Sequence, residues 1–326
     1  MKRRAFIAGL GATVALSCGA EAQQSAVPVI GFLGVGTLEE ARVNFAAIRR
    51  GLAEAGYVEG RNLLVEFRCA DYHADRLPAL ATDLVQRQVA VILAPSGPAT
   101  SAAKAATKSI PVVFFTGFDP VASGFVDSLN RPGGNVTGIF TLNPALLIKR
   151  LELLHEMVPA AKSIALLFSS TGIASAESAM KDLKAAAGTL GVDLMPRKAD
   201  EPGELEDLYE KLAREGIGAI LVGGDAIFSN NRDRLVTLAA RHGIPALYPI
   251  REFSDAGGLL SYGTDYPDAY RQVGLYAGRA LKGEKPSDLP VQQVTRFELV
   301  INLKTAKALG LEVPPALLAS ANRMIE

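Results

Sequence analysis

Short apolar runs alternate along the chain with longer segments in which apolar residues recur at helical spacing. The run over residues 27–34 is apolar and ends in glycine, as buried parallel strands often do. Residues 39–55 then carry apolar side chains three or four positions apart, and Gly56 follows as a helix-ending glycine. The alternation continues with strands predicted over residues 62–67, 89–94 and 110–115 and helices over 74–88 and 99–108. It predicts a parallel sheet with helices on both faces.

The same pattern then restarts. Residues 163–168 match residues 29–34 at an offset of 134, and a second pair of strands matches at an offset of 128. The second strand pair is 217–221 with 89–93, a third is 244–248 with 110–114, and the glycine-led runs 133–138 and 257–262 close the two halves. Because the matching segments follow the same order in both halves, they predict an α/β chain with two similar, doubly wound parallel-sheet lobes.

Two segments near the C-terminus lie outside the repeat. Residues 267–283 have the spacing of an amphipathic helix, and residues 297–302 form a late apolar strand. If the chain recrosses between the lobes, the helix completes the first lobe and the strand completes the second. We therefore predict lobe 1 from residues 27–142 and 266–286, lobe 2 from residues 143–265 and 296–326, and a three-stranded hinge at about residues 141–143, 263–266 and 287–296.

The first residues read as an export signal. Lys2, Arg3 and Arg4 precede an uncharged Gly/Ala-rich run over residues 7–17, which is too short to span a membrane. An A-x-A cleavage pattern ends at Ala22, so residues 1–22 are predicted to be a signal peptide that directs the mature chain to the periplasm.

The route of export has alternatives. Arg3-Arg4-Ala5-Phe6 fits a twin-arginine signal, which we favour over a plain Sec signal with a chance arginine pair. Leu16-Ser17-Cys18 is a weak lipobox, so lipid anchoring at Cys18 is a minority alternative to cleavage near Ala22.

Composition removes several classes of protein. Hydrophobic residues make up 49% of the 326 residues and charged residues 21%, an ordinary globular balance. Lys+Arg and Asp+Glu are both 34, so there is no basic excess for nucleic acid. Two Cys and three scattered His provide no metal-ligand cluster, and we expect neither metal nor cofactor. The balanced surface favours a monomer.

Catalytic motifs are not convincing. Gly34-Val35-Gly36 follows a strand, but position 39 is Glu where a dinucleotide-binding loop has its third glycine. Two S-x-x-K matches, beginning at Ser101 and Ser178, have no accompanying K-T-G and are attributed to chance. The chain is therefore predicted not to be an enzyme.

Polar residues gather where the predicted strands end. In open parallel sheets, ligands bind beyond the carboxyl ends of the strands, beside helix N-termini. Backbone N–H groups and hydroxyls there can bind a ligand carboxylate, and an acid can bind a ligand ammonium. The predicted ligand-binding residues are Gly36, Thr37, Ser96, Gly97, Thr100, Thr116, Asp119, Ser170, Thr171, Asp225, Tyr248 and Asp265. The three acids have an alternative interpretation as turn or cap residues, and Tyr248 as a core residue.

Several phrases resemble a known family. They are G-Y-V-E-G-R-N over residues 56–62, I-P-V-V-F over 110–114, D-P-V-A-S-G over 119–124, L-N-R-P-G-G-N-V-T-G over 129–138 and L-V-I-N-L-K-T-A-K-A-L-G over 299–310. They are similar to the substrate-binding proteins of ABC transporters, in the branch of tryptophan-binding-like lipoproteins, and the resemblance covers residues 27–311.

The resemblance implies a type I periplasmic-binding fold. A small ligand, an amino acid in the better understood members, would be captured between the lobes by hinge closure and delivered to separate permease and ATPase chains. This chain departs from the family in its ligand loops, at Gly97-Pro98 and at Gly223-Gly224, so the ligand does not carry over. An exported enzyme using the same cleft, or the ligand-binding partner of a sensor, is the alternative.

Overall fold

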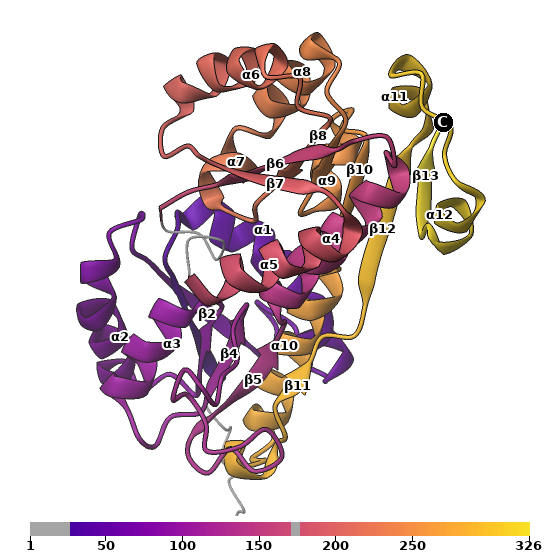
Figure 1. Ribbon diagram of the computed structural model, residues 1–326. Helices are drawn as coiled ribbons and strands as arrows, with labels where there is room; N and C mark the ends of the chain where they lie inside the picture. Colours follow the sequence, from indigo (N-terminus) through magenta and orange to yellow (C-terminus); the bar gives the residue numbers. More distant parts are fainter. Residues whose placement is uncertain (1–26, 171–176) are drawn as a thin grey trace, which may run out of the picture.

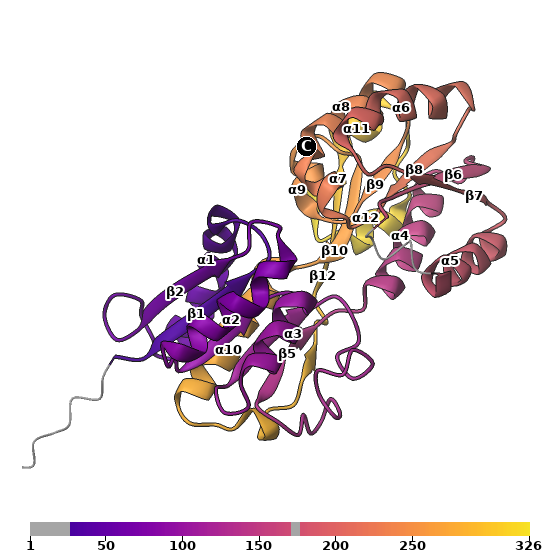
Figure 2. The ribbon, with the colours of Figure 1, turned by 90° about the vertical axis from the view of Figure 1, so that its left-hand side faces the viewer.

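Two separate β-sheets divide the chain into two lobes (Figures 1 and 2). The structure is a computed structural model and describes residues 27–170 and 177–326. In Figure 2 the lobes are distinct bodies joined only where a few segments pass between them. The expected signal peptide and residues 171–176 lie outside the described residues.

Lobe 1 is built on a six-stranded parallel sheet in the order β11-β5-β4-β3-β1-β2. Its strands are β1 (Val29–Gly34), β2 (Leu64–Cys69), β3 (Val91–Ala94), β4 (Val112–Thr116), β5 (Val136–Phe140) and β11 (Gln292–Gln293). Its helices are α1 (Leu38–Glu54), α2 (Leu77–Gln86), α3 (Gly97–Ala106) and α10 (Tyr266–Leu281).

Alternating side chains divide the core of lobe 1 into two layers. Phe32 of β1 packs with α1 and α10 on one face of the sheet, whereas Leu33 packs with α2 and α3 on the other. Both side chains are almost completely buried. Strands covered on both faces must be apolar throughout, which explains why they appear in the sequence as continuous apolar runs.

Helices α1 and α10 approach so closely that their backbones touch. A Cβ added to Gly51 would lie 1.9 Å from the carbonyl oxygen of Arg271, and one added to Gly274 would lie 2.1 Å from that of Ile48. Figure 1 shows the orange α10 lying among the purple elements of lobe 1, far from it in sequence. Glycine at these two positions therefore leaves the space that lets the returning helix pack directly against α1.

Lobe 2 has a seven-stranded sheet in the order β13-β12-β10-β9-β8-β6-β7. Its strands are β6 (Ser163–Phe168), β7 (Asp193–Lys198), β8 (Ala219–Val222), β9 (Ala246–Tyr248), β10 (Leu260–Thr264), β12 (Phe297–Asn302) and β13 (Arg323–Ile325). Its helices are α4 (Asn143–Met157), α5 (Glu177–Leu190), α6 (Leu205–Arg214), α7 (Ala226–Asn230), α8 (Arg232–His242), α9 (Arg251–Asp255), α11 (Leu303–Ala308) and α12 (Pro315–Ser320). Helices α4 and α5 cover one face, and α6 and α8 the other.

The repeat in the sequence corresponds to a repeat in the fold. The order β5-β4-β3-β1-β2 in lobe 1 is the order β10-β9-β8-β6-β7 in lobe 2. The prediction of two similar doubly wound lobes is thus confirmed. Lobe 2 also departs from an all-parallel sheet, because β12 runs antiparallel to β10.

The chain passes between the lobes three times, after β5, after β10 and before β12. The sequence predicts a plain connection over residues 287–296, whereas β11 lies within it and pairs with β5. The first two passages leave the carboxyl ends of β5 and β10, so the carboxyl edges of both sheets adjoin the hinge. The hydroxyls of Thr141 and Thr264, one on each passage, are both buried and lie 3.2 Å apart.

Within the described ranges, the helices lack the combined length and apolar character that crossing a membrane requires.

Candidate functional site

A cavity of about 120 Å³ lies at the carboxyl edge of the lobe 1 sheet. The loop after β1 contributes Gly36 and Thr37 to its lining, and the loop after β3 contributes Ser96. Glu40 and Asn44 of α1 and Tyr270 of α10 complete the polar part of the wall. Three of the predicted ligand-binding residues are therefore brought together around one cavity.

Two of these residues also begin helices. The Thr37 hydroxyl accepts a hydrogen bond from the N–H of Glu40 at 3.3 Å, and the Glu40 carboxylate accepts from the N–H of Thr37 at 2.9 Å. The Ser96 hydroxyl accepts from the N–H of Ala99 at 3.4 Å, at the start of α3 where Gly97 is the first residue. These caps direct the N-termini of α1 and α3 toward the cavity.

Tyr72 borders this region but was not among the residues predicted from sequence. Its hydroxyl donates to the Glu40 carboxylate, and its backbone is left-handed, with φ of +64°. Asp71 is also left-handed, with φ of +51°, which is unusual for two consecutive non-glycine residues. Burial and the hydrogen bond to Glu40 raise the pKa of Tyr72.

The other predicted ligand-binding residues of lobe 1 lie near the same edge, where they form local hydrogen bonds. Thr100 is fully buried, and its hydroxyl donates to the carbonyls of Ala94 and Ser96. Thr116 is 2% exposed at the end of β4, where its hydroxyl accepts from a backbone N–H. The exposed Asp119 carboxylate accepts from the N–H groups of Val121 and Ala122 at 2.8 and 3.2 Å. Both hydrogen bonds reach the same oxygen, Oδ1, so Asp119 is a turn residue.

At the edge of lobe 2, Ser170 belongs to a charged cluster. Its N–H and hydroxyl donate to the two carboxylate oxygens of Asp200 at 2.7 and 2.8 Å, and its hydroxyl accepts from the Lys198 ammonium. The Lys198 contact and the two Ser170 bonds lower the pKa of Asp200 to about 2. The neighbouring Thr171, also predicted as a ligand residue, lies outside the described residues.

Asp225 is the buried acid of lobe 2. It is 8% exposed at the start of α7, and its carboxylate accepts a hydrogen bond from the N–H of Ser169 at 3.3 Å. Burial raises the pKa of Asp225, and its bonds with Ser169 only partly offset that effect. A buried carboxylate beside a strand end could take a cationic group of a ligand.

Tyr248 has a different environment from the one predicted. It is 1% exposed in the hydrophobic core of lobe 2, stacked on Phe253 with 4.7 Å between ring centroids. Core packing therefore accounts for Tyr248 without a ligand.

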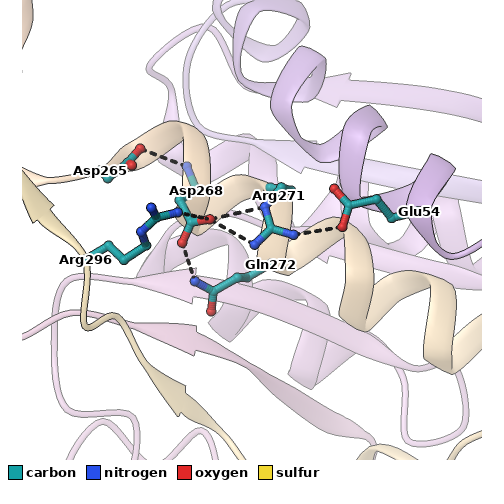
Figure 3. A network of polar contacts seen from close by, with 6 residues as sticks. All are labelled: Glu54, Asp265, Asp268, Arg271, Gln272 and Arg296. Carbon is teal, nitrogen blue, oxygen red and sulfur yellow. Dashed lines mark hydrogen bonds and ion pairs between the residues drawn. The ribbon is translucent and has the colours of Figure 1, made fainter.

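Asp265 begins α10 on the second passage between the lobes. Its carboxylate accepts from the N–H of Asp268 at 3.0 Å, so it serves as the N-cap of the helix. Figure 3 shows that Asp268, only 6% exposed, receives Arg271 and Arg296 from two sides. Burial favours a higher pKa for Asp268, but hydrogen bonds from Gln272 and Arg271 outweigh it and lower the pKa. Arg296 lies on the third passage, so this network ties two passages together.

A family model described as ABC transporter substrate binding protein matches residues 27–325. The chain belongs to this family. Among its relatives, a tyrosine-binding protein of Clostridioides difficile (strain R20291) is 27% identical over 276 residues, which is 85% of this chain and 78% of that protein. The family resemblance drawn from the sequence phrases is confirmed.

Solved structures agree with this substrate-binding protein assignment. The ABC domain from Streptococcus pneumonia in complex with L-Trp has a TM-score of 0.78 at 26% identity, covering 91% of this chain and 99% of that one. A conserved domain protein from Vibrio cholerae has a TM-score of 0.77 at 28% identity, with the same coverage. Both support the type I periplasmic-binding fold, and the described relatives are ligand-binding proteins.

Proposed function

We propose that this substrate-binding protein captures a small organic solute between its lobes, with an amino acid as the first candidate, and delivers it to an ABC importer. The observation that carries the proposal is the placement of the cavity at the edge where the hinge joins the lobes. Its wall combines the polar side chains of Thr37, Glu40 and Ser96 with the aromatic Tyr270, groups suited to a polar end and an apolar end of one ligand.

Aromatic side chains support an amino acid with a ring. Phe115, Tyr266 and Tyr270 form a cluster with ring centroids 5.4 to 6.3 Å apart. Tyr270 belongs both to this cluster and to the cavity wall. A tyrosine-binding relative and a relative bound to L-Trp make these two amino acids the first to test.

Capture would proceed by closure about the three passages. A ligand held first on lobe 1 favours the closed state only if lobe 2 adds contacts to it. Asp225 and Ser170 are the proposed contacts from lobe 2, while Gly36, Thr37 and Ser96 are those from lobe 1. The closed monomer would be recognised by separate permease and ATPase chains. We propose binding without turnover.

An importer's binding protein must meet its solute outside the cytoplasm, so this role requires export. We propose that residues 1–22 direct export to the periplasm by the twin-arginine route and are then removed near Ala22.

The ligand can be identified by mass spectrometry of what co-purifies with the native mature protein. Refolded, ligand-free protein is then titrated calorimetrically with the twenty amino acids. We expect at least one amino acid to bind one to one with micromolar or tighter affinity. A co-purified compound of another class, together with no amino acid binding, would overturn the amino acid assignment.

A further inference from the structure

Arg150 is a buried cation without an acidic partner. It lies on α4 and is 6% exposed. Its Nε donates to the carbonyl of Tyr262 at 2.6 Å, and its Nη2 donates to the carbonyl of Pro249 at 3.2 Å. Across residues 27–170 and 177–326, no carboxylate forms an ion pair with it.

Other arginines of this protein that are partly withdrawn from water do have acids. Arg68 pairs with Glu66 and Asp83, and Arg271 pairs with Asp268 and Glu54. Arg150 is more deeply buried than either, yet both of its described hydrogen bonds go to neutral carbonyl groups. Carbonyl oxygens satisfy some of its donors, but a buried charge without a counter-charge remains costly.

The position of the guanidinium group relates it to the ligand. Pro249 directly follows β9, and Tyr262 lies in β10 two residues before its carboxyl end. A Cβ added to Gly263 would lie 3.4 Å from Nη2 of Arg150. The guanidinium group therefore lies at the carboxyl edge of the lobe 2 sheet, where the second passage leaves for lobe 1.

The neighbouring side chains connect this place to the lobe 1 cavity. Three residues after Gly263, the half-buried Tyr266 begins α10, and its ring lies 5.8 Å from that of Phe115 and 6.3 Å from that of Tyr270. Tyr270 in turn lines the cavity. Burial lowers the pKa of Arg150 to about 10, so the group still carries its charge at neutral pH.

We infer that Arg150 binds the carboxylate of the amino acid when the lobes close. The inference rests on the proposed function, and it names the missing anion as the ligand's own acid group. An arginine fork held by two carbonyls is pre-oriented, so a charge-assisted bond to a carboxylate costs little further ordering. The same observation admits a structural alternative, in which Arg150 only fastens α4 to β9 and β10.

The first test leaves the protein unchanged and removes the acid from the ligand. Wild-type protein is titrated with L-tyrosine and tyramine, and with L-tryptophan and tryptamine. We expect the amines to bind at least tenfold more weakly than the amino acids. Equal affinities would overturn the assignment of Arg150 and leave the proposed function intact. No binding by any amino acid would overturn both.

The second test is a cycle between protein and ligand. In Arg150→Gln the preference for amino acid over amine should fall by tenfold or more, and Arg150→Lys should retain part of it. A purely fastening role would weaken both ligands equally, which would contradict the inference. Arg234→Gln is the matched control, because that arginine pairs with Glu206 on the surface of the same lobe and should keep the full preference. Should Arg150→Gln fail to fold, Arg150→Lys takes its place in the cycle, and an unchanged preference for amino acid over amine in that variant would contradict the inference.

Discussion

At the residue scale, each of the three predicted acids at the sheet edges can stabilise the fold, bind the ligand, or do both. Asp225 is buried, Asp265 caps a helix and Asp119 closes a turn. The sequence places all three at strand ends but does not distinguish these roles, because burial and backbone hydrogen bonds depend on neighbours from distant segments. Variants that separate charge from hydrogen bonding can distinguish them.

Asp225→Asn should stabilise the ligand-free protein at neutral pH. The pKa of Asp225 is raised in the folded state. The contribution of this carboxyl group to wild-type stability is therefore full below the unfolded pKa of about 3.9 and is lost as pH rises through the folded pKa. Asn removes the buried charge and still accepts from Ser169. Melting temperatures measured from pH 3 to 7 should show a gain for Asn at pH 7 that disappears near pH 3. A less stable Asn variant at pH 7 would show that the ionised carboxylate is stabilising.

Asp265→Ala should lower the free energy of unfolding by about 0.5–2 kcal/mol, because the α10 cap is lost. Asp265→Asn retains a capping oxygen and should unfold at nearly the wild-type urea concentration. If Asn binds ligand ten- to a hundredfold more weakly at unchanged stability, the acid also contacts the ligand, as the sequence predicts. An Ala variant as stable as the wild type would contradict the capping role.

The other predicted site residues differ in how much of their position in the structure the sequence alone could predict. Thr37 and Ser96 follow strands and precede helices, and the structure places both at the cavity. Tyr248 instead ends the predicted strand 244–248, and its ring packs into the core because it belongs to the strand itself. Arg150 did have a signal, since it shares the helical stripe of Leu147, Leu151 and Leu154, all buried. A charge on an apolar stripe marks a special position.

At the element scale, the repeat predicts which strands lie side by side, and the structure repeats the same order in both sheets. The hydrophobic period does not indicate the direction of a strand. The antiparallel direction of β12 follows from the path of the third passage, which the period does not reveal. The short elements α12 and β13 carry too few residues to show a period. Long periodic segments were therefore predictable, and terminal additions were not.

The contact between α1 and α10 gives a prediction about elements. Gly274→Ala would place a Cβ 2.1 Å from the carbonyl oxygen of Ile48, which forces the helices apart. We expect the free energy of unfolding, measured in urea, to fall by about 1–3 kcal/mol.

Gly188→Ala in α5 is the matched control for that helix contact. A Cβ there meets no atom within 4 Å, so better helix propensity should leave the protein equally stable or up to about 1 kcal/mol more stable. Equal stability of Gly274→Ala and the wild type would show that the helices can separate without loss.

At the scale of the whole molecule, the lobes are joined by three passages that share polar contacts. Thr141 and Thr264 join the first two, and the Asp268 network joins the second and third (Figure 3). These contacts lie beside the passages, at the edge about which the proposed closure would turn one lobe against the other.

One ligand should close the two lobes of a monomer. Small-angle scattering of the refolded mature protein, with and without the amino acid that calorimetry identifies, tests it directly. A ligand that moves an open-to-closed ratio from 1:99 to 99:1 must bind the closed form about 10⁴-fold more tightly. We predict a smaller radius of gyration at one ligand per chain, with the mass of a monomer throughout. An unchanged scattering curve at saturating ligand, or two ligands per chain, would contradict closure around a single ligand.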